Sequence, residues 1–173
     1  KKTSNLYFFN KKIMIPNFLF NKFIIDKYNY KRKNNFIWSV QREKGLKDTL
    51  NMWVNFVYPK NRKTKLFIFG IDKNKFRKLK NYYKKYNIIF LGRVKKDILK
   101  KTYKTSLGMI CLGYDETFCL NVIEANACGL PVITFGETAL NDMIKNNYNG
   151  LIVKNYRSLS LKILELLNKD QLI

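Results

Sequence analysis

The stretch that decides the fold is LGMICLGYDETFCLNVIEANACGLPVITF, residues 107–135. Its first six residues, 107–112, form an apolar run of strand length, and residues 131–135 form another. Between them, residues from about 118 to 128 predict a helix, for which Gly129 and Pro131 are stop signals. Strand, helix and strand in this order predict one unit of a parallel sheet.

The same alternation extends outward from this unit. We predict further strands at 36–40, 65–70, 87–92 and 151–153, and further helices at 46–57, about 76–86, 96–105, 140–144 and about 158–168. The fold class is therefore α/β, a Rossmann-like parallel sheet with helices on both faces. We assign residues 35–173 to this single domain and residues 1–34 to a linker segment that leads into it.

The amino-acid composition indicates one folded domain and excludes several classes of catalysis. Of the 173 residues 46% are hydrophobic, which is enough for one domain with a real core. The chain contains no histidine, which excludes Ser-His-Asp, Cys-His and HExxH catalysis by these residues alone. The three cysteines, Cys111, Cys119 and Cys128, lie in apolar surroundings and form no CxxC pair. We expect them to be reduced core thiols of a cytoplasmic protein.

The chain is strongly basic, with 34 Lys and Arg against 12 Asp and Glu and a formal net charge of +22. Such a charge favours a basic nucleic-acid-binding module. The cations are mostly lysines scattered along the whole chain, however, a bias that AT-rich codon usage also produces, and no motif for base readout accompanies them. We therefore expect no specific nucleic-acid partner and leave an anionic membrane surface open. No apolar run approaches the ~20 residues that span a bilayer.

The loop after the strand at 107–112 is the most informative place for a ligand, because open parallel sheets bind ligands beyond the carboxyl ends of their strands. Thr117 is suited to cap the following helix. The N–H groups of Phe118, Cys119 and Leu120 then offer an anion site for a diphosphate. Farther along the helix, the Glu124 carboxylate suits two vicinal ribose hydroxyls. Taken singly, Glu116 also reads as a first-turn carboxylate that favours the helix dipole, and Glu124 as an ordinary surface glutamate.

The residues 116–133, ETFCLNVIEANACGLPVI, resemble as a set the signature of retaining glycosyltransferases of the GT-B fold, family 4 type. Two glutamates separated by seven residues precede an Ala-rich turn, a Gly, a Pro and a β-branched strand. Further similar segments follow the family's order: Ile15-Pro16-Asn17, Lys44-Gly45-Leu46 and Asn149-Gly150-Leu151-Ile152-Val153. The resemblance implies the C-terminal, donor-binding half of a GT-B fold.

The resemblance also implies residue roles. Glu124 matches the glutamate that holds the donor ribose, and Glu116 matches the one near the transferred sugar, the candidate catalytic residue. Lys44 matches the lysine that neutralises the donor diphosphate. Val94 matches a loop residue whose backbone meets the base.

Departures from the family pattern limit this transfer. Trp38-Ser39 stand where the family has Gly-Arg, so Arg42 is a substitute for the second phosphate cation. The family's Gly-Gly pair either appears here as Thr138-Ala139 or is displaced to Gly136, and Asp142 is similar in position to a family Glu. There is no Asp-x-Asp pair, and we expect no metal ion and no cofactor.

The sequence thus predicts a domain that binds a nucleotide sugar for retaining transfer of a hexose to a hydroxyl of a glycan, lipid or protein. Because the chain begins with Lys rather than Met, we expect it to be an excerpt that lacks an N-terminal acceptor domain and has little activity alone. Three alternatives remain: a non-catalytic nucleotide- or partner-binding subunit of a split glycosyltransferase, the nucleic-acid module, and a glycosidase that uses Glu116 and Glu124.

Overall fold

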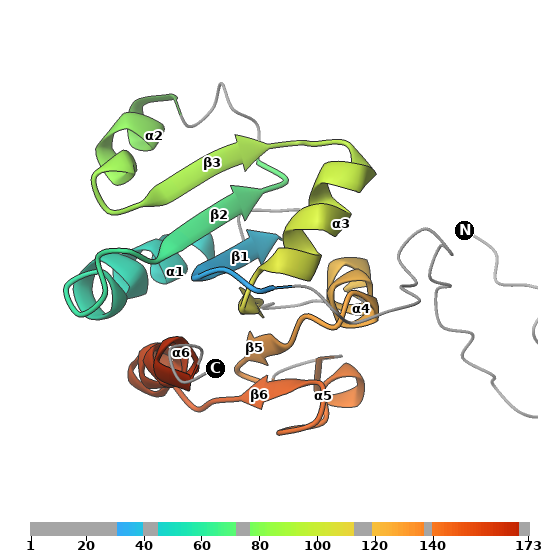
Figure 1. Ribbon diagram of the computed structural model, residues 1–173. Helices are drawn as coiled ribbons and strands as arrows, with labels where there is room; N and C mark the ends of the chain where they lie inside the picture. The colour runs from blue at the N-terminus through green and yellow to red at the C-terminus, as the bar shows by residue number, and fades with distance from the viewer. Residues whose placement is uncertain (1–30, 40–44, 72–76, 113–118, 137–139, 170–173) are drawn as a thin grey trace, which may run out of the picture.

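The computed structural model describes residues 31–39, 45–71, 77–112, 119–136 and 140–169 (Figure 1). Within them, six parallel strands form one sheet in the order β3-β2-β1-β4-β5-β6. The strands are β1 Asn35–Ser39, β2 Lys65–Phe69, β3 Ile88–Gly92, β4 Gly108–Ile110, β5 Val132–Thr134 and β6 Gly150–Ile152. The first strand, β1, lies in the middle of the sheet. Strands β2 and β3 follow on one side of it, and β4, β5 and β6 follow on the other side. The predicted parallel sheet is confirmed.

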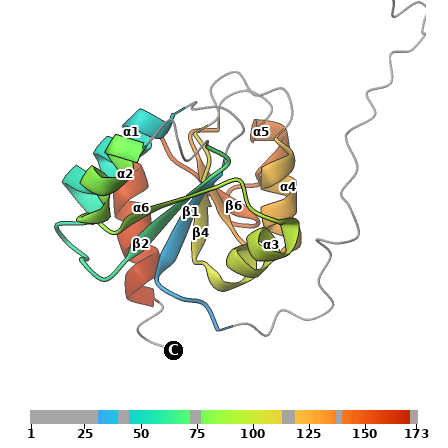
Figure 2. The same cartoon turned by 90° about the horizontal axis from the view of Figure 1, so that it is seen from above.

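Helices cover both faces of the sheet. They are α1 Leu46–Met52, the π-helix η2 Trp53–Val57, α2 Arg77–Lys84, α3 Lys96–Thr105, α4 Leu120–Ala127, α5 Leu140–Met143 and α6 Tyr156–Lys169. Seen from above, α1, α2 and α6 lie on one side of the strands, and α3, α4 and α5 lie on the other (Figure 2). This is the predicted Rossmann-like arrangement.

The core is centred on β1, whose Phe36, Ile37 and Trp38 have no exposed surface. A strand covered on both faces needs a continuous apolar run, and this one supplies it. Phe36 packs edge-on against Trp53 of η2, with ring centroids 6.1 Å apart. The central strand and the first helical layer therefore hold each other in place.

One predicted helix is two elements in the structure. Residues 46–57 begin as α1, but from Trp53 the chain winds as a π-helix, and the Tyr58 N–H donates to the Trp53 carbonyl, five residues back, at 2.9 Å. The Trp53 indole donates to the Tyr86 carbonyl at 3.2 Å. Periodic apolar positions do not distinguish the two helix types, because both leave Trp53 and Val57 buried.

In the part of the chain that the structure describes, no helix is both long and apolar enough to cross a bilayer. Of the segment that we assign to a linker, residues 1–30 lie outside that part.

Candidate functional site

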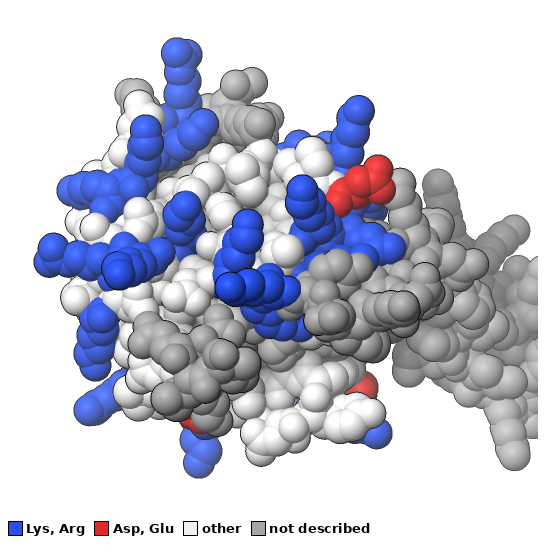
Figure 3. All heavy atoms as spheres, viewed as in Figure 1, with Lys and Arg blue, Asp and Glu red and all other residues white. Residues whose placement is uncertain are grey.

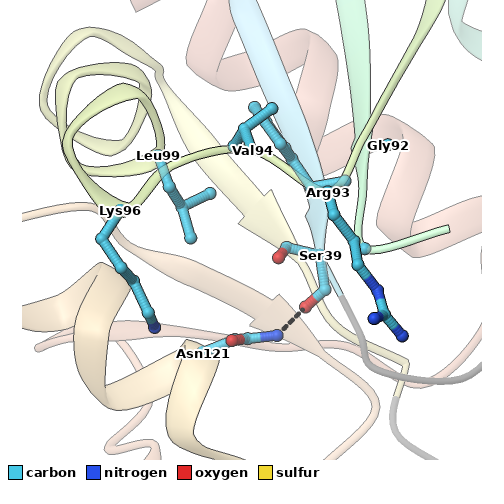
Figure 4. Close-up of a pocket in the computed structure, with 9 residues that line it drawn as sticks. Ser39, Gly92, Arg93, Val94, Lys96, Leu99 and Asn121 are labelled. Carbon is cyan, nitrogen blue, oxygen red and sulfur yellow. Dashed lines mark hydrogen bonds between the residues drawn. The ribbon is translucent and has the colours of Figure 1, made fainter.

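A pocket of about 480 Å³ opens at the carboxyl ends of β1, β2 and β3, where they meet the N-terminal ends of α3 and α4 (Figure 4). It lies next to the point where strand order reverses, between β1 and β4, the usual place for ligands in such sheets. Its lining comes from five separate segments of the chain: Ser39, Phe69, Gly70, Gly92, Arg93, Val94, Lys96, Leu99 and Asn121.

Val94 lies in the pocket wall. The contact of its backbone with a base stays a prediction. The preceding Gly92 has a φ of 69°, in the left-handed region that a side chain rarely adopts. After this turn the chain leaves β3 and runs past the carboxyl ends of the strands to α3. The pocket thus gains an apolar wall from Val94 and Leu99 and a cation from the exposed Arg93.

The start of α4 differs from the prediction. The helix begins at Leu120, and its cap is Cys119, with an extended backbone (φ −97°, ψ 91°) and no side-chain hydrogen bond. The assignment of Thr117 as the cap is therefore wrong. Cys119 is buried with its Sγ 3.9 Å from that of Cys111, so its thiol lies in the core directly before the helix begins. Leu120 takes the first helical position, and the Val122 N–H already donates to the Cys119 carbonyl at 3.0 Å.

The three cysteines are buried and none of them is in a disulfide, as predicted. Burial raises the pKa of the Cys128 thiol, against the opposing effect of Lys100 and Lys104. A protonated, buried thiol is a poor nucleophile. We therefore assign the cysteines to packing.

Glu124 is the most informative carboxylate of the site. Its side chain is only 4% exposed, so the interpretation as a surface glutamate is wrong. Oε1 accepts a hydrogen bond from the Lys96 ammonium, which itself lines the pocket. Oε2 is buried and has no hydrogen-bond partner among the described residues. Glu124 lies one helical turn from Asn121, which lines the pocket, so both are on the same face of α4.

Asn121 ties α4 to the sheet. Its side-chain amide donates to the Ser39 carbonyl, the last of β1, at 2.9 Å (Figure 4). This bond fixes the start of α4 beside the end of the central strand. Sequence reasoning missed both Asn121 and Lys96; a lysine in the first turn of a helix, where the dipole disfavours it, was the available signal for Lys96.

The other predicted site residues, Arg42, Lys44, Glu116 and Phe118, lie outside the described residues. The described residues contain no group of three His, Cys, Asp or Glu side chains that would hold a metal ion. They do place two cations, Arg93 and Lys96, in the pocket lining, and Lys96 pairs with the buried carboxylate of Glu124. Such a site suits an anionic ligand that also carries hydroxyl groups.

A sequence model of the family described as glycosyl transferases group 1 matches residues 17–172. The chain belongs to this glycosyltransferase family. The predicted resemblance is confirmed at this level.

Curated relatives match this glycosyltransferase chain over shorter segments. An uncharacterized glycosyltransferase of Methanocaldococcus jannaschii is 35% identical over 69 residues, which is 40% of this chain and 18% of that protein. A D-inositol 3-phosphate glycosyltransferase of Rhodococcus jostii is 35% identical over 71 residues, 41% of this chain and 16% of that protein. The matched part thus spans less than a fifth of the length of these two relatives.

Solved glycosyltransferase structures share the fold. TarM of S. aureus superposes with a TM-score of 0.73 at 21% identity, over 96% of this chain and 35% of that one. The C-terminal domain of the group 1 glycosyl transferase LpcC from Francisella tularensis gives 0.63 at 20% identity, over 82% of this chain and 79% of that one. The Rossmann-like GT-B domain predicted from the sequence is therefore confirmed.

Proposed function

We propose that this glycosyltransferase domain binds a nucleoside diphosphate sugar in the pocket beside β1 and serves retaining transfer of a hexose. The observation that carries the proposal is the buried Glu124, which has an unpartnered oxygen and a cation from the pocket wall at its other oxygen. A buried carboxylate oxygen without a donor is costly, and a ribose hydroxyl is a suitable donor.

Each part of the donor has a candidate partner. We assign the base to the Val94 backbone, the ribose to Glu124, and the diphosphate to Lys44 with Arg42. The first N–H groups of α4, near Phe118, Cys119 and Leu120, add positive potential. Glu116 is our candidate for the catalytic contact to the transferred sugar. In this scheme protein charge neutralises the leaving group, without a metal ion.

Related proteins support this class of donor. TarM was solved in a complex that contains UDP, and Anabaena HepE, which superposes with a TM-score of 0.62 at 15% identity, was solved with UDP and glucose. Because the matched part is a small share of its curated relatives, we assign the acceptor, a glycan, lipid or protein, to a further domain. Buried thiols that form no disulfide suit a reducing, cytoplasmic compartment.

The proposed reaction breaks the bond between the anomeric carbon and the diphosphate oxygen, and the electron pair leaves with the diphosphate. The acceptor hydroxyl attacks from the same face, forms the new glycosidic bond, and passes its proton to the departing phosphate. The cations and the helix N–H groups would act on the charge that develops on the leaving group. The anomeric configuration is retained because bond breaking and attack share one face.

Calorimetry with UDP, GDP and ADP, and with their hexose conjugates, tests the donor site. We expect one base to bind, with Glu124→Ala and Lys44→Ala each weakening it at least about tenfold. Glu165→Ala is the control, since Glu165 pairs with Lys162 on α6, far from the pocket lining in sequence. Unchanged affinity in both site variants would refute the assignment.

A second assay separates binding from turnover. We expect these 173 residues by themselves to bind donor yet transfer hexose at a small fraction of the rate of a two-domain enzyme, because we assign the acceptor to a further domain. Product analysis by mass spectrometry measures this. Robust turnover by the chain alone would contradict the need for a further domain.

A further inference from the structure

Lys96 stands where a lysine is electrostatically disfavoured. It is the first residue of α3, at the positive end of the helix dipole, and the preceding cap, Lys95, makes no side-chain hydrogen bond to the helix. A residue that breaks a local rule of helix design needs a compensating contact elsewhere. For Lys96 that contact lies on a different helix.

The contact is with Glu124, 28 residues along the chain, on α4. Both helices cover the same face of the sheet (Figure 2). The Lys96 side chain is 50% exposed and lines the pocket, whereas the Glu124 side chain is 4% exposed. The lysine therefore reaches from the pocket wall to a carboxylate that water hardly touches.

The ion pair uses only part of the capacity of the carboxylate. An ionised carboxylate offers about four acceptor sites on its two oxygens. The Lys96 ammonium occupies one on Oε1, and Oε2 has no partner among the described residues. Acceptor capacity for two vicinal hydroxyls therefore remains beside the ion pair.

The Lys96 ammonium also offsets the negative charge of the Glu124 carboxylate. A lone buried carboxylate beside a diphosphate would repel it, and an unpaired buried charge is costly. The Lys96 ammonium on Oε1 compensates the negative charge of the carboxylate. The hydrogen bond also restricts the rotation of the carboxylate group. The pair is then close to neutral toward the diphosphate and still accepts hydroxyl donors.

We propose that Lys96 is a positioning residue that holds Glu124 in register for the two ribose hydroxyls, so that the pair makes the site select ribonucleotides over dideoxyribonucleotides. This inference rests on the nucleotide-sugar function proposed above. It assigns to Lys96 no contact with the phosphates.

The test measures calorimetric affinities of the full chain for UDP, GDP and ADP and for their 2′,3′-dideoxy forms. For the base that binds, we expect the wild type to prefer the ribonucleotide by roughly tenfold or more, the usual range for a hydrogen bond to a charged group. Lys96→Met should reduce this preference to less than about threefold and leave the dideoxy affinity nearly unchanged. Lys96→Arg should restore most of the preference, since it keeps the cation.

Controls separate positioning from other roles. Lys95→Met makes the same change one residue away at an exposed position outside the pocket lining, and should keep the preference. Glu124→Gln should lose it, and adding Lys96→Met to Glu124→Gln should cost no further discrimination. Because the preference is a ratio within each variant, a partly unfolded sample does not distort it.

Each other outcome overturns a defined statement. If Lys96→Met weakens ribo and dideoxy forms equally, Lys96 contacts the phosphates and the positioning role is wrong. If it behaves like Lys95→Met, the ion pair serves only the fold and the inference is wrong. If the wild type binds none of the three nucleotides, the proposed function itself fails.

Discussion

At the scale of single residues, Gly150 shows how closely this fold brings two strands together. It pairs with Val132 across β5 and β6, and a Cβ added there would lie 2.3 Å from the Val132 carbonyl oxygen and 2.9 Å from the Ile144 side chain. The nearer of these atoms belongs to a backbone, which cannot rotate away. Gly150 is thus a steric requirement of the β5–β6 pairing.

We predict that Gly150→Ala lowers the free energy of unfolding by at least about 2 kcal/mol, because the strands must move apart. Thermal unfolding followed by circular dichroism measures it. Gly108→Ala is the matched control, since its added Cβ meets side chains and no backbone atom: the Phe36 ring at 3.1 Å and Ile133 Cδ1 at 3.7 Å. Equal melting temperatures for the two variants would contradict the steric argument.

Tyr103 gives a prediction about pH. Burial raises the pKa of the Tyr103 hydroxyl well above its ordinary value, and the Ser39 side chain only partly opposes that rise. The unfolded chain therefore loses this proton near pH 10 while the folded chain keeps it, so stability falls as the pH rises above about 10. Tyr103→Phe should flatten that fall by up to about 1.4 kcal/mol per pH unit.

Urea unfolding at three pH values from 9 to 11 provides the measurement. Tyr148→Phe, at a side chain that is 86% exposed, is the control and should keep the wild-type slope. Lysine deprotonation affects all variants alike and cancels in the comparison. If the free energy of unfolding falls equally with pH in the wild type and in Tyr103→Phe, the Tyr103 hydroxyl does not cause the loss of stability above about pH 10.

At the scale of elements, apolar periodicity predicts where a helix or strand lies, but it does not predict contacts between residues far apart in the sequence. The apolar repeat of α3 predicted its bounds, 96–105, and the apolar run of β1 predicted a buried strand within one residue. The start of α4 was misplaced because Cys119 packs on Cys111, a contact that no local signal reveals. The ion pair of Lys96 with Glu124 was not predicted for the same reason, because it joins residues of two helices that are 28 positions apart in the sequence.

Arg32 carries an element-scale prediction. Just before β1, its guanidinium donates to the carbonyls of Ser106 and Gly129, which precede β4 and β5. One side chain thus joins the starts of three neighbouring strands. We predict that Arg32→Met costs about 2 kcal/mol in the free energy of unfolding, because both carbonyls lose a charged donor. The exposed neighbour variant Lys31→Met should cost less than about 0.5 kcal/mol in the same urea titration.

At the scale of the whole molecule, the net charge of +22 dominates long-range behaviour. Lys and Arg are spread widely over the face seen in Figure 3, with few acidic residues among them. No described site converts this charge into specific recognition of a polyanion. A diffuse positive field attracts any anionic surface, and salt screens it over a Debye length of about 8 Å at physiological ionic strength.

We predict that the chain binds vesicles of phosphatidylcholine with about 30% phosphatidylserine at roughly 20 mM salt, and is released at about 500 mM, where screening is several times shorter in range. Co-sedimentation measures the bound fraction, and pure phosphatidylcholine vesicles are the control that should bind nothing. Exposed apolar side chains such as Phe56 and Tyr82, at 45% and 52%, are the alternative anchor. Binding to neutral vesicles, or binding that resists high salt, would mean that these side chains insert and that charge alone does not explain the attraction.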